Sequence, residues 1–427
     1  MISGLTFAQS SDTLKNERFS IHGQTTVINQ FKPGFSAKYT GLNSLLTGEE
    51  DKTSITSTLF LGARLWKGAS IFFDPELGGG YGLSQTLGIA AAPNGETYRI
   101  GNPAPDVYIA RLYFRQIFSL SVKQSHQDPD FNQLAQYLPV KYFAITIGKI
   151  GITDYFDDNK YSHDPRAQFM SWALMDNGAW DYPANTRGYS PSIVLEFVTP
   201  RHEIRYGFSL VPLMANGSFM NWHLLEANSH SLEYTYHYKL SNHNGSIRFS
   251  GFFTTANMGN YRESLALDPQ NPDITDSRAI GHTKYGFGVN AEQDFTDYAG
   301  CFLRAGWNDG NNETWAFTEI DRTISAGISM TGLKWKRNND NLGIAYVASG
   351  LSRPHRDYLQ AGGYGFLLGD GNLNYSPEQL AECYYSAELL KDHIYLTAAY
   401  QLIMNPGYNA DRQGPINIFS LRVHVKI

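Results

Sequence analysis

The chain has 427 residues, of which 42% are hydrophobic and 17% are charged, and its formal net charge is −6. The negative charge argues against nucleic acid as the main partner, because a phosphate backbone attracts basic surfaces. No stretch approaches the roughly 18 consecutive apolar residues that a transmembrane helix needs. A helical membrane protein is thereby excluded, whereas a membrane β-barrel stays open, since alternating strands give no long apolar run.

Residues 1–11, MISGLTFAQSS, look like the end of a secretory signal, although a basic start and a full apolar core are missing. We therefore expect residues 1–18 to be a residual signal or a flexible N-terminus, and residues 19–427 to form one domain. The two cysteines, Cys301 and Cys383, are far apart and show no metal-ligand spacing. We expect them to be small apolar side chains on strands, and we expect no cofactor and no resident metal.

Segments in which apolar and polar residues alternate recur along the whole chain, and this period of two is typical of strands with two different faces. Long and short connections between them alternate, except that 119–141, on the short side, is long without a reason in the sequence. The pattern predicts an all-β fold, a transmembrane antiparallel β-barrel of about 16 strands with long extracellular loops and short periplasmic turns. The expected strands are 19–30, 55–66, 69–77, 107–118, 142–150, 189–198, 203–211, 230–238, 246–254, 284–294, 300–308, 323–334, 342–349, 378–390, 393–403 and 416–427.

The last seven residues, LRVHVKI, show the alternation most clearly, with apolar residues at 421, 423, 425 and 427 and basic residues between them. An edge strand of a soluble sheet has the same appearance, but the other strands and the aromatic content of 14% favour a barrel. One face of such a strand contacts lipid, and the other contacts water in the lumen.

Charged residues on the strands have apolar neighbours on both sides, which places the charges on the face opposite to lipid. An Arg or Lys on the lipid face near the midplane would cost roughly 2–4 kcal/mol. Guanidinium groups, carboxylates and aromatic rings together suit a hydrated polyol, although the same charges would also serve merely to hold barrel and loops together. The residues expected to line the channel and bind sugar are Arg64, Asp74, Glu76, Arg111, Tyr113, Arg115 and Arg304.

The longest connection, 151–188, is expected to fold inward as a constriction loop. Its segment 165–175 is predicted to be a short helix with Asp164 as N-cap. An alternative use of residues 154–159 is a divalent cation site, although their spacing matches no calcium loop. The candidate residues of the loop are Asp157, Asp158, His163, Arg166, Trp172, Asp176 and Trp180.

Nine short segments carry a resemblance: GYGLS at 80–84, PNGE at 93–96, ARLYFRQ at 110–116, FDDNKYSHDPR at 156–166, WALMDNGAWDY at 172–182, RAGWNDG at 304–310, HRDY at 355–358, NPGYN at 405–409 and DR at 411–412. In number and order they resemble the carbohydrate-selective porins of the OprB type, from the outer membrane of Gram-negative bacteria. The resemblance implies a sixteen-stranded barrel that passes glucose and related sugars by facilitated diffusion. It also implies that Arg111 and Arg115 lie on an arginine-bearing strand and that 156–182 is the constriction motif. Ile427 departs from the Phe that ends many such proteins.

The expected function is thus facilitated diffusion of mono- or oligosaccharides through an outer-membrane channel, with small sugars and lipid as partners and no enzymatic activity. A general or anion-preferring porin would use the same arginines. An outer-membrane glycosidase would need an acid/base pair among Asp309, Glu313, Glu319 and Asp321. A gated receptor would need a plug domain, for which 1–18 is too short. Monomer and homotrimer both remain open.

Overall fold

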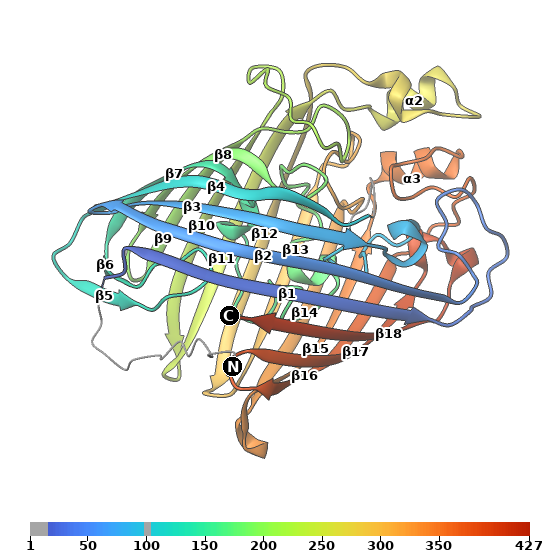
Figure 1. Ribbon diagram of the computed structural model, residues 1–427. Helices are drawn as coiled ribbons and strands as arrows, with labels where there is room; N and C mark the ends of the chain where they lie inside the picture. Colours follow the sequence, from blue (N-terminus) through green and yellow to red (C-terminus); the bar gives the residue numbers. More distant parts are fainter. Residues whose placement is uncertain (1–15, 98–103) are drawn as a thin grey trace.

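Sixteen antiparallel strands form one closed barrel in the computed structural model, which describes residues 16–97 and 104–427 (Figure 1). Each strand pairs with its neighbours in chain order, and β1 pairs with β18 to close the ring. The predicted fold class is therefore confirmed. The strands are β1 (Phe19–Lys32), β2 (Glu50–Trp66), β3 (Ala69–Gly80), β4 (Asp106–Ser119), β7 (Tyr142–Ile150), β8 (Ser190–Val198), β9 (His202–Ser209), β10 (Asn228–Leu240), β11 (His243–Ala256), β12 (His282–Thr296), β13 (Ala299–Asn308), β14 (Arg322–Gly332), β15 (Arg337–Gly350), β16 (Glu378–Leu390), β17 (Ile394–Met404) and β18 (Ile416–Lys426).

The helices are short and lie in the connections between strands. α2 and α3 are at the end of the barrel that is on the right in Figure 1, where the long connections gather. Within the described ranges, no helix is long and apolar enough to cross a membrane. The helices are α1 (Trp172–Met175), α2 (Tyr261–Leu267) and α3 (Arg353–Gln360), with 3-10 turns η1 (Leu83–Thr86), η2 (Ile152–Asp154), η3 (Ile274–Ser277), η4 (Leu333–Trp335), η5 (Pro406–Tyr408) and η6 (Ala410–Arg412).

The closing strand β18 shows why the barrel needs alternation. Val423 pairs with Val27 of β1, and Arg422 pairs with Ile28. Leu421 is 49% exposed on the outside of the barrel, whereas Arg422 is 0% exposed inside it. Apolar side chains therefore cover the outer face, as contact with lipid requires.

Several strand ends differ from the prediction because turns are tighter than expected. β10 continues to Leu240 and β11 begins at His243, since Ser241 and Asn242 adopt φ values of 51° and 68°. Positive φ at both central residues is the geometry of a two-residue hairpin turn, so the connection between the expected strands 230–238 and 246–254 is shorter than predicted. Similarly, η4 makes the turn before β15, which begins at Arg337 and not at 342 as expected.

The connection between β4 and β7 contains a two-stranded hairpin that the sequence did not explain. Its strands are β5 (Gln124–Gln127) and β6 (Gln136–Pro139), which pair only with each other. The hairpin lies at the end of the barrel opposite to α2 and α3 (Figure 1). Because long loops are extracellular in this kind of barrel, the hairpin belongs to the periplasmic end.

A charge on the lipid-facing side of β13 should destabilise the protein by an amount that depends on its depth in the membrane. Leu303, in the middle of the strand, is 47% exposed, and we expect Leu303→Arg to lower the free energy of unfolding by roughly 2–4 kcal/mol. Urea unfolding of the protein in lipid vesicles measures this change. Ala299→Arg, at the end of the same face, is the matched control and should cost only roughly 0–1 kcal/mol. Equal costs at the two positions would contradict this assignment of faces.

Candidate functional site

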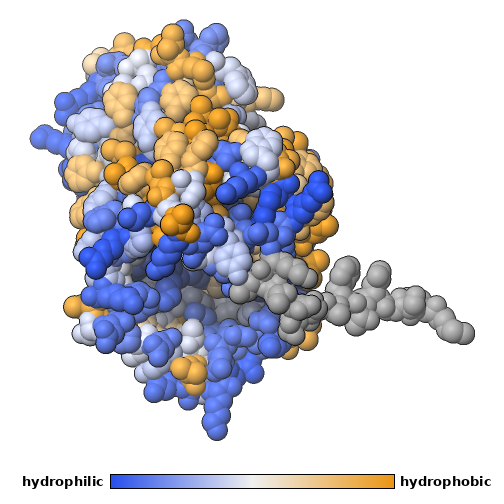
Figure 2. Space-filling view, turned by 90° about the vertical axis from the view of Figure 1, so that its left-hand side faces the viewer, coloured by the Kyte–Doolittle hydropathy of each residue, from blue (hydrophilic) through white to orange (hydrophobic). Residues whose placement is uncertain are grey.

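A cavity of about 880 Å³ lies inside the barrel, toward the wall made by β1–β4. Its other sides come from the connection 151–189 and from the periplasmic hairpin. Viewed from the periplasmic end, the molecule is hollowed, and the rim of the hollow is mainly hydrophilic (Figure 2). The cavity is thus the polar interior that a channel for hydrated solutes needs.

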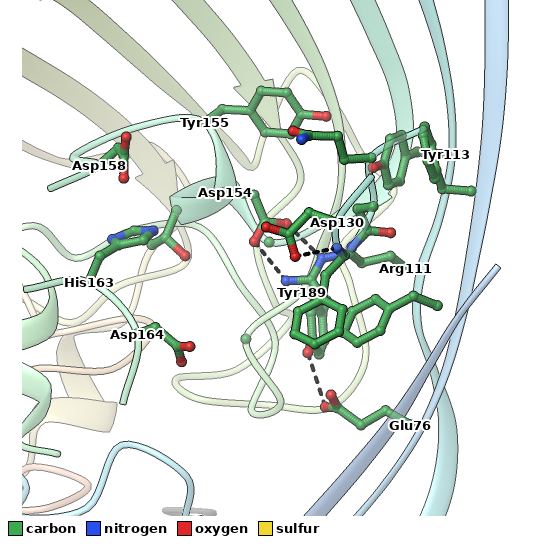
Figure 3. A pocket seen from close by; sticks show the side chains of 18 of the residues that line it. Glu76, Arg111, Tyr113, Asp130, Asp154, Tyr155, Asp158, His163, Asp164 and Tyr189 are labelled. Atoms are coloured by element: carbon green, nitrogen blue, oxygen red, sulfur yellow. Dashed lines mark hydrogen bonds and ion pairs between the residues drawn. The ribbon is translucent and has the colours of Figure 1, made fainter. Parts of the chain in front are cut away.

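Glu76 of β3 is the best-satisfied carboxylate on the cavity wall. It accepts hydrogen bonds from the hydroxyls of Thr58 at 2.5 Å and Tyr108 at 2.6 Å. Tyr189 donates to it at 3.0 Å, and the guanidinium of Arg166 lies at the same distance (Figure 3). Glu76 therefore connects β2, β3 and β4 to loop 151–188.

Arg111 of β4 is held flat beside Glu76. Its Nε and Nη2 each donate to one oxygen of Asp154 at 2.7 Å, a bidentate pair (Figure 3). Its guanidinium carbon lies 5.1 Å from the centre of the Tyr189 ring, and Nη1 is 3.6 Å from Asp74. Such a planar pair fixes the direction of the remaining N–H groups. The side chain is still 15% exposed, so solutes in the cavity can reach it.

Arg115 follows Arg111 by four residues on β4 and belongs to a second set of ion pairs. Its Nη1 donates to Glu196 at 2.5 Å and to the hydroxyl of Thr146 at 3.3 Å. Arg205 approaches the other oxygen of Glu196 at 3.4 Å. The ring of Tyr155 lies 5.7 Å from the guanidinium. Each arginine on this wall thus has a carboxylate and an aromatic ring next to it.

Arg166 links two connections that come from different parts of the chain. Its Nε donates to Glu96 at 2.7 Å, while Nη2 reaches Glu76. Glu96 lies between β3 and β4, whereas Arg166 lies between β7 and β8. The loop 151–188 is therefore attached to the cavity wall as well as to the connection that precedes β4.

Charged side chains from the far wall of the barrel hold the backbone of loop 151–188. This arrangement is needed because buried N–H and C=O groups must be paired, and little of the loop is helical. The contacts are Glu233 of β10 with the N–H of Asp157, Arg304 of β13 with the carbonyls of Asp157, Ser162 and Leu174, Glu382 of β16 with the N–H groups of Met170 and Ser171, and Arg422 of β18 with the carbonyls of Pro165 and Gln168.

The expected helix at 165–175 is wrong in extent. Only α1, from Trp172 to Met175, is α-helical. Asp164 instead closes a turn, in which its carboxylate accepts from the N–H of Arg166 and its carbonyl accepts from that of Gln168. The carbonyls of Pro165 and Gln168 are used by Arg422, so the barrel wall competes successfully with helix formation.

The structure divides the predicted site residues into two sets. The set that lines the cavity is Glu76, Arg111, Tyr113, Arg115, Asp158, His163, Arg166 and Trp172. The other set, which the structure places away from the cavity wall, is Arg64, Asp74, Arg304, Asp157, Asp176 and Trp180.

The expectation that Arg64, Asp74 and Arg304 line the channel is corrected by their contacts. Arg304 is 0% exposed beneath the loop and forms an ion pair with Asp157 at 3.0 Å. Arg64 donates to the carbonyl of Ala135 at 3.2 Å, and Asp74 accepts from Asn132 at 2.9 Å. Asp74 and Arg304 are buried beneath loops, whereas Arg64 is partly exposed near the end of β2.

Tyr108 shows how a lining residue was missed. By a strict period of two, Tyr108 and Arg111 lie on opposite faces of β4. The pairing with β3 shifts there, because Asp74 pairs with Arg111 while Pro75 pairs with Ile109. Ala110 is therefore the extra residue of a bulge, and the bulge turns Tyr108 to the inside. Further lining residues that were not predicted include Glu96, Asp154, Tyr155, Tyr189 and Glu196.

The alternative sites proposed from the sequence are engaged in other contacts. In residues 16–97 and 104–427, no group of three or more His, Cys, Asp or Glu side chains is placed to hold a metal ion. Asp154 and Asp157 of the suggested cation site face Arg111 and Arg304. Of the carboxylates considered for glycoside cleavage, Glu313 pairs with Arg278 at 2.6 Å and Asp321 lies 3.0 Å from His355.

His163 of loop 151–188 lines the cavity and bears a positive charge. Its Nδ1 lies 3.4 Å from Asp176, and Asp158 and Arg304 also face it. Burial lowers the pKa of His163, but contact with Asp176 and the charges of Asp176 and Asp158 raise it to about 9. The imidazole is therefore protonated at neutral pH.

Comparison with known proteins supports the same architecture. Residues 53–427 match the family model described as carbohydrate-selective porin, OprB family. The high-pH structure of Pseudomonas putida OprB is similar, with a TM-score of 0.70 and 14% identity over 96% of this chain and 94% of that one. The outer membrane channel DcaP of Acinetobacter baumannii gives a TM-score of 0.51 at 10% identity, over 96% and 97%. No curated protein matches the sequence.

The raised pKa of His163 predicts a loop that loosens at high pH. Stabilisation by the ion pair is complete below the ordinary value of 6.5 and is lost as pH rises through about 9. Buried Asp176 then loses its counter-charge, and we expect the noise of the open-channel current to increase. Single-channel recording from neutral to alkaline pH measures it. His163→Gln at neutral pH should resemble the parent at high pH, and equal noise in both proteins at neutral pH would contradict this role.

Removing Arg304 should destabilise loop 151–188 more than loss of the His163–Asp176 ion pair does. Arg304→Met removes the positive partner of the buried Asp157 carboxylate and takes one donor from each of three loop carbonyls, which we expect to cost roughly 3–5 kcal/mol. Urea unfolding and proteolysis of 151–188 measure the effect. The double variant Arg304→Met with Asp157→Asn removes the stranded charge and should recover part of the loss. A single variant as resistant as the parent would show that the loop is held elsewhere.

Proposed function

This chain belongs to the OprB family of carbohydrate-selective porins of the outer membrane, and from that premise we propose that it passes hydrated mono- or small oligosaccharides by facilitated diffusion along the wall bearing Arg111 and Arg115. The cluster of Arg111, Asp154, Tyr189 and Glu76 is the observation that carries the proposal. It combines charged hydrogen-bonding groups and an aromatic ring on the wall of a polar cavity.

Sugar recognition follows from the groups that the ion pairs leave free. A guanidinium has five N–H donors, and Asp154 takes one from Nε and one from Nη2 of Arg111. The remaining donors and the second lone pairs of the carboxylates suit hydroxyls, which both donate and accept. The ring of Tyr155 on the cavity wall offers apolar surface to the C–H faces of a sugar.

The charge of the cavity favours neutral solutes over anions. Seven described lining residues are carboxylates, and five are arginines. The carboxylates are Glu76, Glu96, Asp130, Asp154, Asp158, Asp164 and Glu196, and the arginines are Arg111, Arg115, Arg166, Arg187 and Arg205. Even with protonated His163, the arginines have no excess of positive charge to attract anions. An uncharged polyol is therefore a better match than the anion-preferring alternative.

Passage also requires that binding be weak. Arg111 and Arg115 are already paired with Asp154 and Glu196, so a sugar only exchanges water for its own hydroxyls at the free positions. Such an exchange changes the free energy little, and a solute that enters can leave again. The ion pairs thus orient the free N–H groups of Arg111 and Arg115 toward a sugar without giving it a high affinity.

The test is single-channel current in a planar bilayer, titrated with glucose and then with maltooligosaccharides. We expect saturable block in the parent. Arg111→Ala with Arg115→Ala should weaken block by roughly tenfold, because a hydrogen bond contributes about 0.5–1.5 kcal/mol net and both arginines are lost. Arg201→Ala, at an exposed residue in the β8–β9 turn, is the matched control and should leave block unchanged.

Two outcomes would contradict parts of this proposal. Unchanged block in the double variant would remove both arginines from the sugar site while leaving a carbohydrate channel. Steady conductance of the parent that is indifferent to every sugar tested would instead favour a general porin.

A further inference from the structure

The periplasmic connection between β4 and β7 enters the barrel instead of turning outside it. Five residues between Gln127 and Gln136 line the same cavity as Arg111 and Arg115: Asp130, Phe131, Asn132, Gln133 and Leu134. Asp130 of this connection lines the cavity together with Arg111 and Asp154 (Figure 3). Asn132 adopts a φ of 54° between the bridged residues Asp130 and Gln133, which makes a tight tip. The tip is thus a wall of the cavity at its periplasmic side.

Aromatic and apolar contacts hold this tip against the barrel wall. The ring of Phe131 stacks on Phe60 of β2, with the centres 4.5 Å apart and an angle of 16° between the planes. Leu134 is 1% exposed and belongs to an apolar cluster with Phe72 and Tyr113. Burial of Leu134 and stacking of the half-buried Phe131 both favour docking of the tip against the barrel wall.

Polar contacts connect the tip to the cavity wall that bears Arg111. Asn132 donates to Asp74 at 2.9 Å, and Asp74 lies 3.6 Å from Arg111. Arg64 and the N–H of Glu17 both donate to the carbonyl of Ala135, at 3.2 Å and 2.8 Å. The carboxylate of Glu17 in turn accepts from the N–H of Ala135 at 2.8 Å. The hairpin is therefore fastened on both sides, as a fixed part of the wall rather than a swinging lid.

We propose that the connection 120–141 is a second constriction, on the periplasmic side, that sets the size limit for solutes in series with loop 151–188. Both segments project into one cavity, the loop from the extracellular end and the hairpin from the periplasmic end. A solute that passes the loop must then pass between the hairpin tip and the loop. This inference rests on the proposed channel function, but its test uses ions and polymers rather than sugars.

The test compares channels with and without the hairpin. In one variant, residues 124–139 are replaced by a short Gly-Ser turn. We expect its ion conductance to rise roughly twofold or more, because one of two resistances in series is removed. We also expect larger polyethylene glycols to enter, as measured by the reduction of single-channel current across a series of polymer sizes.

A second variant keeps the length of the chain. Phe131→Ala with Asn132→Ala removes the stacking and the bond to Asp74, and should give a smaller rise in conductance with added noise. Val122→Ala is the matched control, because Val122 is fully exposed in the same connection, and its conductance should equal that of the parent.

Unchanged conductance and an unchanged polymer limit in either hairpin variant would overturn the proposal. If the shortened chain does not fold, the double substitution alone decides the question. A rise in conductance with no sugar block in the parent would support the second constriction and contradict the proposed sugar site. Sugar block in the parent, with no effect of the hairpin variants on conductance, would support the sugar site and contradict the second constriction.

Discussion

The structure depends on one constraint: charged side chains on the strands have to point inward, and once inside they have to be paired. Lipid outside forbids the opposite arrangement. The polar groups inside gain most when they satisfy buried backbone groups of other segments, because an unpaired buried carbonyl or N–H is costly. Arg304, Arg422 and Glu382 follow this rule, since each binds main-chain atoms of loop 151–188.

Two kinds of inward charge result from this constraint. On β3 and β4, Glu76, Arg111 and Arg115 pair with side chains and stay accessible from the cavity. On the opposite wall, Arg304 and Glu382 are covered by the loop they bind. The cavity is therefore displaced toward one side of the barrel, and its polar surface comes from a few strands together with two inserted segments. Loop 151–188 and the hairpin tip therefore both project into the space inside the barrel.

The family relation fits this account despite the low sequence identity of 14% to Pseudomonas putida OprB. Alternation and inward charge can be kept by many different residues, so a barrel tolerates extensive substitution on both faces. Matching short segments, such as 156–166 and 172–182, lie in the loop that the barrel charges bind. Loop and wall are complementary because charged side chains of the wall pair with buried backbone groups of the loop.

The sequence by itself determined the fold class, the number of strands and the inward direction of the charged residues, because a period of two follows directly from strand geometry. Tertiary structure decided which inward residues reach the cavity. Arg304 and Arg111 look alike in the sequence, but only Arg304 is covered by a loop. It also decided the bulge at Ala110, which turns Tyr108 inward, and the docking of the hairpin on Phe60. These features depend on pairing between distant segments, which a local pattern does not encode.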